Sequence, residues 1–413
     1  MNARFIKKTS IIILLSVYVS LVCRAYSVLT HQAIIDVNWD KVLLPLLKQK
    51  FPDSSNDAFR EAHAYVYGGA VVPDMGYYPF GSKLFTNLIH YVRSGDFVTT
   101  VLNEAKGLYE YAFALGMLCH WYADVYGHPI GINTSVPLIY PKLKLKFGDT
   151  VTFAENHVSH LRTEFSFDVL QTARGNYAST AYHDFIGFKV SEPLLQKAFK
   201  ETYGLEVNEL FGNLSKAVGR FRFTIMHLFP FMTKAAWAYK KGEIQKVQPT
   251  ATSRNFIFRM HQKNSRHRFE KMERPGFFAH VLAVFIHIVP KWGLLKVIKF
   301  KDPGPEAEKK FIASFDTVTV HYAESIMLLH QHAVHALHPV NVDFDTGIKT
   351  KEGEYALADK AYCDLLIKLK QKHFETVSPS LKKNILSFYA TALTDPPKRN
   401  SKMMQALAQL RTK

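Results

Sequence analysis

Three side chains that can bind a metal ion follow one another at intervals of four residues: His120, Asp124 and His128. They continue an apolar run, Leu108 to Leu118, that has the character of a helix. In a helix, residues i, i+4 and i+8 lie on one face. Zn²⁺ accepts both imidazole nitrogen and carboxylate oxygen as ligands. The pattern predicts a metal-binding helix face that ends at His128, because Gly127 and Pro129 favour a helix end. Two buried histidines and a capping aspartate are the alternative interpretation.

Further metal-competent side chains lie on either side of this stretch. In chain order they are His31, Asp74, His90, His160 and Glu164. His31 follows Thr30, a candidate helix N-cap, and Asp74 lies in a predicted turn. His160 and Glu164 form a second i, i+4 pair on a predicted helix. Each of them alone is more often structural, so only their combination favours a metal centre.

The N-terminus has the organisation of an export signal over residues 1–25. A basic start precedes an apolar run at residues 11–22, which is short for a membrane span. Small residues up to Ala25 then form a cleavage motif, so we expect an exported protein, periplasmic or secreted. Cleavage there would make Tyr26 the new N-terminus, and a free α-amino group with its own carbonyl can chelate a metal.

The chain of 413 residues is strongly basic, with a formal net charge of +17. In an exported protein this charge favours phosphate-bearing partners, either an anionic membrane surface or nucleic acid, and it does not choose between them. Three cysteines are too few for a disulfide scaffold. No protein partner can be inferred.

Helical periodicity dominates the rest of the chain, without alternating strands, a glycine-rich phosphate loop or an internal repeat. The sequence therefore predicts an all-α fold. Residues 130–150 read as a loop, and residues 241–275 as a basic linker or surface segment. Residues 276–413 are predicted to form a helical C-terminal extension. Its apolar stretch 277–297 is interpreted as a buried helix or as an interfacial helix on lipid.

The order of the candidate ligands resembles that of the zinc-dependent phospholipase C family, which is related to the zinc-dependent single-strand nucleases of fungi. The resemblance spans about Tyr26 to Pro230 and assigns residues 26–240 to a phospholipase C-like domain. It implies an all-helical fold that holds up to three zinc ions and hydrolyses phosphodiesters. In the family the third-zinc histidine usually comes six residues after the bridging aspartate, whereas His128 comes four after Asp124.

The resemblance also implies a role for each position. Asp74, His90, His120 and Asp124 would hold one zinc, and Asp74 could also act as a general base. Asp124 would bridge to a second zinc, bound in addition by His31 and by the amine and carbonyl of Tyr26. The third zinc would be held by His128, His160 and Glu164.

Three functions remain open from the sequence. The first is a phospholipase C that acts on phospholipid head groups at a membrane surface. The second is a single-strand nuclease-like phosphodiesterase, and the third is a non-enzymatic membrane-binding protein stabilised by zinc. The adjacent His183 and Asp184 offer a further alternative, the HD type of phosphohydrolase.

Overall fold

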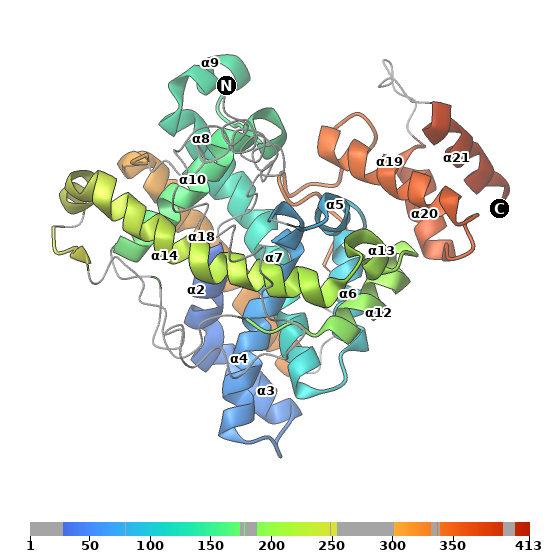
Figure 1. Cartoon of the computed structure of the whole chain (residues 1–413), viewed down its shortest axis with the longest axis horizontal. Coiled ribbons are helices and arrows are strands. Elements are labelled where there is room, and N and C mark those ends of the chain that lie inside the picture. Colours follow the sequence, from blue (N-terminus) through green and yellow to red (C-terminus); the bar gives the residue numbers. More distant parts are fainter. Residues whose placement is uncertain are drawn as a thin grey trace, which may run out of the picture.

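Helices make up the structure, a computed structural model of the chain (Figure 1). It describes residues 28–78, 80–173, 177, 188–247, 249–253, 301–331, 337, 339–390 and 401–413, with side chains omitted at a few of these positions. Within these residues there is no strand, which confirms the predicted all-α fold. The predicted signal, Tyr26, the apolar stretch 277–297 and the pair His183 and Asp184 lie outside the described residues.

The first half of the chain forms the body of the molecule, with α7 at its centre (Figure 1). Its elements are α2 (Val28–Asn38), η1 (Trp39–Leu43), α3 (Leu44–Lys50), α4 (Asn56–Val71), η2 (Val72–Tyr77), α5 (Lys83–Tyr91), α6 (Ser94–Glu104), α7 (Leu108–Gly127), η3 (His128–Ile132), α8 (Asn133–Ile139), α9 (Pro141–Phe147) and α10 (Phe153–Ala173). Later come α12 (Glu192–Tyr203), α13 (Val207–Phe211), α14 (Leu214–Val247), α18 (Gly304–His330), α19 (Ala356–Gln371), α20 (Pro379–Phe388) and α21 (Ser401–Thr412).

Helices α4 and α7 pack against each other at a pair of glycines. A Cβ atom on Gly69 would lie 2.0 Å from the carbonyl oxygen of Phe113, and one on Gly116 would lie 2.0 Å from that of Val66. Real Cβ atoms do not approach so closely, so only glycine allows this separation of the two backbones. The close packing brings the end of α4 beside the metal-competent face of α7.

The segment after α7 differs from its prediction. Gly127 and Pro129 do not end the helical path, because η3, a π-helical turn, continues it into α8 and then α9. Proline is tolerated there since it occupies the first turn of a helical element, where its missing N–H costs least. The predicted loop over residues 130–150 is therefore wrong for most of its length. His128 is buried at the junction rather than exposed at a frayed end.

The C-terminal half packs directly onto this body. Tyr322 of α18 donates a hydrogen bond to the carbonyl of Leu115 in α7 at 3.0 Å, whereas α19, α20 and α21 form a group at one side (Figure 1). Helix α14 runs without interruption past residue 240. The domain boundaries at 240 and 275 stay predictions.

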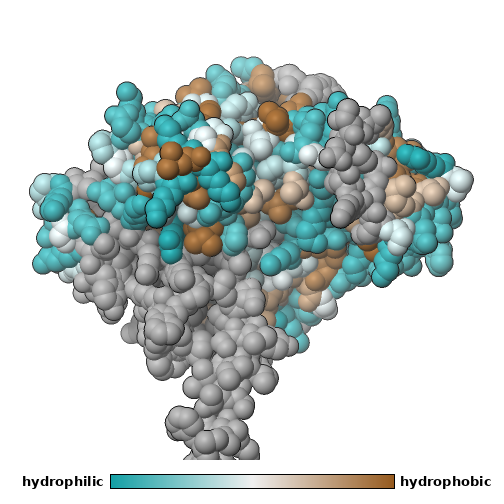
Figure 2. All heavy atoms as spheres, turned by 90° about the horizontal axis from the view of Figure 1, so that it is seen from above, coloured by the Kyte–Doolittle hydropathy of each residue, from teal (hydrophilic) through white to brown (hydrophobic). Residues whose placement is uncertain are grey.

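The surface seen in Figure 2 is mainly hydrophilic, with hydrophobic residues scattered between. Among the described helices, none is both long and apolar enough to cross a membrane.

Candidate metal centre

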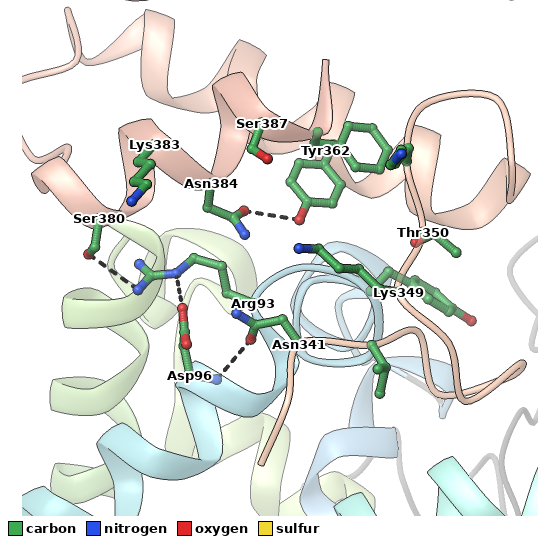
Figure 3. Close-up of a pocket in the computed structure, with 14 residues that line it drawn as sticks. Arg93, Asp96, Asn341, Lys349, Thr350, Tyr362, Ser380, Lys383, Asn384 and Ser387 are labelled. Atoms are coloured by element: carbon green, nitrogen blue, oxygen red, sulfur yellow. Dashed lines mark hydrogen bonds and ion pairs between the residues drawn. The ribbon is translucent and has the colours of Figure 1, made fainter. Parts of the chain in front are cut away.

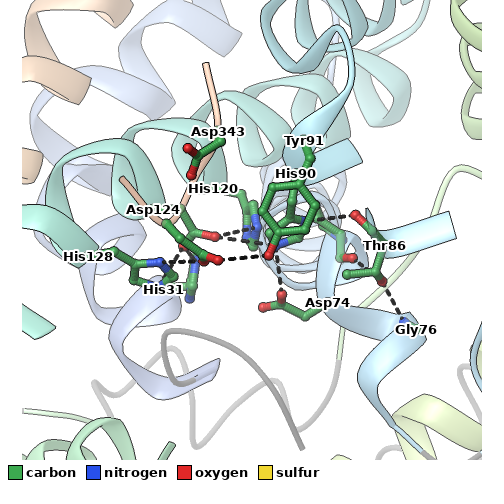
Figure 4. Close-up of polar contacts among 12 residues, drawn as sticks. His31, Asp74, Gly76, Thr86, His90, Tyr91, His120, Asp124, His128 and Asp343 are labelled. Carbon is green, nitrogen blue, oxygen red and sulfur yellow. Dashed lines mark hydrogen bonds and ion pairs between the residues drawn. The ribbon is translucent and has the colours of Figure 1, made fainter. Parts of the chain in front are cut away.

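Asp124 lies at the centre of the candidate site and is completely buried in α7. Its two carboxylate oxygens face different neighbours. The Oδ2 atom is 3.2 Å from Nε2 of His120 and 3.4 Å from Nε2 of His90. The Oδ1 atom is 3.3 Å from Nε2 of His31 and 3.8 Å from Nε2 of His128. This carboxylate can therefore bridge two metal ions (Figure 4).

Helix α5 and the turn η2 place Asp74 beside His90. The Thr86 hydroxyl donates to the carbonyl of Pro73 at 2.6 Å and accepts from the backbone N–H of Gly76 at 2.8 Å. These two bonds hold the turn against the helix, one turn before His90 (Figure 4). Asp74 Oδ1 lies 3.2 Å from His90 Nε2 as a result.

Two histidines are oriented by backbone carbonyls. Nδ1 of His90 donates to the carbonyl of Thr86 at 2.9 Å, and Nδ1 of His120 donates to that of Ala70 at 2.8 Å. A carbonyl can only accept, so each ring carries its proton on Nδ1 and, when neutral, presents the lone pair of Nε2 to the site. Metal-binding histidines show this arrangement, in which the second nitrogen fixes the tautomer.

Helix α2 brings His31 to the other side of Asp124. Thr30, the preceding residue, donates a hydrogen bond to Asp168 of α10 at 2.8 Å, which ties the two helices together. The His31 ring stacks on that of His120, with 4.6 Å between the ring centroids. Tyr26, predicted to complete this side of the site, lies outside the described residues.

A second group of ligands lies next to the first. His160 Nε2 is 2.9 Å from Glu164 Oε1, an i, i+4 pair on α10. His128 Nε2 lies 3.5 Å from the same oxygen. His128, His160 and Glu164 thus form one buried group of potential ligand atoms, all within 4.8 Å of one another, and Asp74, His90, His120 and Asp124 form the other.

The distances between the histidine nitrogens and carboxylate oxygens fit ligands of a zinc ion better than hydrogen bonds between these side chains. The carboxylate oxygens of Asp74, Asp124 and Glu164 are buried and accept no well-directed hydrogen bond in the described structure. Leaving several buried carboxylates in that state would be costly without a cation. Two ligands at about 2.1 Å from a tetrahedral zinc lie about 3.4 Å apart. Most of the histidine–carboxylate distances above are close to that value.

Without metal, the buried carboxylates draw protons onto the histidines. Burial lowers the pKa of His90, but Asp124 and Asp74 outweigh it and raise the pKa to about 10. Burial also opposes protonation of His128, and the surrounding carboxylates raise its pKa to about 9. Burial acts against the charge of Asp124 as well, yet the histidines hold its pKa well below the usual range. Zinc binding must therefore displace protons.

One residue in contact with the centre was not predicted. Asp345, which is 3% exposed, lies with Oδ1 3.4 Å from Nδ1 of His128, on the ring edge opposite Glu164. Tyr91 donates to its Oδ2 at 2.9 Å, and Tyr355 donates to the same oxygen. Asn133 of α8 donates to its backbone carbonyl at 2.6 Å. A carboxylate in this position can orient a metal-binding imidazole.

The segment around Asp345 covers the first ligand group. The ring of Phe344 lies 4.8 Å from that of His90 and 5.7 Å from that of His120, and its backbone N–H donates to the His90 carbonyl. Burial and the nearby Asp345 raise the pKa of Asp343 to about 7. The sequence signal for this segment is the alternating acidic pattern of residues 341–347.

The aromatic residues after Asp74 are mostly packed inside. Tyr77 and Tyr78 are buried, and Tyr77 lies against the edge of His90 with 5.7 Å between ring centroids. Phe80 is exposed to 41% and has the Arg220 guanidinium over its ring. Tyr77 therefore shields the site from one side.

Residues 30–213 match the family model described as zinc dependent phospholipase C. This part of the chain belongs to the zinc-dependent phospholipase C family. No curated protein and no solved structure gives a significant match to the chain. The matched region of this phospholipase C-like protein contains all eight described ligand candidates.

Asp343, Phe344 and Asp345 lie outside the matched region, as do α18 to α21. Phe344 lies against His90 and His120, and Asp345 contacts His128. The C-terminal half therefore contributes to the surroundings of the metal centre. The family assignment supports zinc and a hydrolase of the phospholipase C type.

Proposed function

We propose that this protein is an exported phospholipase C that hydrolyses phospholipid head groups through a site of three zinc ions. The observation that carries the proposal is the pair of neighbouring buried ligand groups, one of which contains Asp124, inside the region that matches the family. Periplasmic or secreted localisation is part of the proposal and rests on the signal-like N-terminus.

Three sets of residues would hold the ions. Asp74, His90, His120 and Asp124 offer two imidazoles and two carboxylates, and His128, His160 and Glu164 offer a second set. The remaining set is the Oδ1 side of Asp124 with His31, completed by the amine and carbonyl of Tyr26. Support for the last set is the 3.3 Å distance between Asp124 Oδ1 and His31 Nε2, which is close to that expected of two ligands of one ion.

The chemistry that zinc supplies in such a site is activation of water near neutral pH and neutralisation of charge on the phosphoryl oxygens. The residues of this chain would hold and orient the reacting groups. Asp74 presents buried carboxylate oxygens at the edge of the site and could accept a proton from the attacking water. The backbone carbonyls of Thr86 and Ala70 fix the rings of His90 and His120, so that little reorganisation is needed during the reaction.

A lipid substrate is favoured by the exposed surface of a short basic helix. Helix α9 follows η3 and α8 and exposes Leu145 to 90%. Lys142, Lys144 and Lys146 lie on the same short helix. Basic residues around an exposed leucine fit the surface of an anionic membrane.

Metal content and activity measured together test the proposal. The exported protein is purified, its zinc is counted, and phosphatidylcholine, phosphatidylinositol and single-stranded DNA are offered side by side. We expect cleavage of a phospholipid and at least two zinc ions per chain. Asp124→Asn should lose zinc and activity, whereas the exposed Asp57→Asn should keep both. Folded, zinc-loaded protein that cleaves no phosphodiester would refute the enzymatic proposal, and preferential cleavage of DNA would refute the lipid substrate.

The ligand role of the N-terminus needs a separate test. A variant with one additional residue before Tyr26 should bind one zinc fewer and lose activity, because the chelating amine is displaced. Unchanged zinc content in that variant would show that the N-terminus is not a ligand.

A further inference from the structure

A pocket of about 300 Å³ lies between the matched domain and the C-terminal half, and none of the ligand candidates of the metal centre lines it. One wall comes from the end of α5 and the start of α6, and the other from residues 341–351 with α19 and α20 (Figure 3). Because the second wall lies outside the family match, the pocket exists only where the C-terminal half packs against the matched domain.

The pocket carries an excess of positive charge. Arg93, Lys349, Lys351 and Lys383 line it, and Asp96 is its one acidic lining residue. Asp96 is already paired with Arg93, with 2.7 Å between Oδ2 and Nε. The three lysine ammonium groups form no ion pair within the described residues, although Glu352 and Glu354 are close in sequence to Lys351. A concave surface of one charge sign concentrates its potential on a bound counterion.

Arg93 is built into the floor of the pocket. The residue is 8% exposed, and its guanidinium donates to the carbonyl of Thr202 at 2.8 Å and to the Ser380 hydroxyl at 3.2 Å. Its backbone adopts the left-handed conformation, with φ of 50°, which is unfavourable for an arginine and is retained only where the surroundings impose it. Arg93 thus joins the two walls and fixes the shape of the pocket.

Neutral donors complete the lining. Asn384 accepts a hydrogen bond from the Tyr362 hydroxyl at 3.0 Å, so its amide N–H groups remain available to a ligand. The side chains of Arg93, Lys349 and Asn384 face a common space in Figure 3. Ammonium groups combined with neutral N–H and O–H donors are the usual partners of a phosphate group.

We propose that this pocket binds the phosphate group of an organic phosphate, such as the headgroup of an anionic phospholipid. It would be a second phosphate site, separate from the metal centre and independent of zinc chemistry. Tyr91 links the two, because it lines the pocket and its hydroxyl donates to Asp345, which contacts His128.

The test compares two variants with the same change of charge. Lys349, Lys351 and Lys383 are replaced by glutamine in the first, and the exposed Lys41, Lys48 and Lys106 in the second. Each zinc-loaded protein is titrated with glycerol 3-phosphate by calorimetry. Each is also floated with phosphatidylcholine vesicles with and without phosphatidylglycerol. Zinc content and melting temperature are recorded for all three proteins, so that misfolding is recognised.

We expect the pocket variant to lose about tenfold or more in affinity for glycerol 3-phosphate at one site, with unchanged zinc content, while the control variant binds as the wild type does. A matching loss of binding to phosphatidylglycerol vesicles identifies a lipid headgroup as the ligand. Loss of glycerol 3-phosphate binding alone identifies a soluble phosphate ester. Equal behaviour of the two variants in both assays would refute the proposal. Failure of zinc binding or phospholipid cleavage in the wild type would refute the proposed function and leave this result standing.

Discussion

The most informative perturbation is Asp345→Asn, because it changes a residue outside the matched domain that contacts His128. The substitution keeps the size of the side chain and the bonds that Tyr91 and Tyr355 can donate to its oxygen. It removes the negative charge 3.4 Å from Nδ1 of His128. We expect the zinc ion proposed at His128, His160 and Glu164 to bind more weakly, while the ion proposed at Asp74 and its partners is unaffected.

The size of the effect can be estimated in two ways. Full charges 3.4 Å apart attract by about 5 kcal/mol at an effective dielectric constant of 20, which is an upper bound because a zinc-bound imidazole carries only part of a charge. Loss of a partner behind a metal ligand typically lowers metal affinity by about 10- to 100-fold. We therefore expect a loss of about 1.4 to 2.7 kcal/mol in zinc binding at this one site.

Competition with a chromophoric chelator measures this loss, and elemental analysis after dialysis counts the ions that remain. Asp359→Asn is the matched control, since it removes a partly buried carboxylate from the same half of the chain without contacting the centre. Tyr355→Phe, which removes one bond to the Asp345 carboxylate, should give a smaller loss in the same direction. If Asp345→Asn folds and retains every zinc ion at wild-type affinity, Asp345 does not orient His128 and the reasoning is wrong.

Other predictions follow from the packing and the charges of the site. Gly116→Ala should lower the free energy of unfolding by about 1–3 kcal/mol in urea titrations, because its Cβ would meet a backbone carbonyl at 2.0 Å; Gly242→Ala, with open space around it, should not. Zinc binding to metal-free protein near pH 8 should release protons, seen as a dependence of the calorimetric heat on the buffer, because His90 and His128 have pKa values raised to about 10 and about 9. Their raised pKa values stabilise the metal-free fold fully below about pH 6.5. That stability should be lost as the pH rises through 9 to 10, and a melting temperature that is flat over this range would contradict the assignment. Asp74→Asn should lower phospholipase activity by about 100-fold or more and leave zinc at the His128 group; full activity would exclude a proton-accepting role.

The sequence by itself determined the features that depend on local spacing. Helical periodicity predicts the all-α fold, because apolar residues at intervals of three and four lie on one face only when the chain is helical. The intervals His120–Asp124 and His160–Glu164 place each pair on one helix face for the same reason. These pairs lie together in the structure as their spacing requires.

The tertiary structure decided everything that depends on contacts between distant segments. Asp74 reaches His90 through the hydrogen bonds of Thr86, and no short-range pattern encodes that distance. The helical path past Pro129 was missed because glycine and proline usually end helices, whereas here packing against α18 and α10 supports a π turn. Asp345 lies more than two hundred residues from His128 in the chain. Its role depends on how the C-terminal half folds back onto α7, and local spacing carries no information about that.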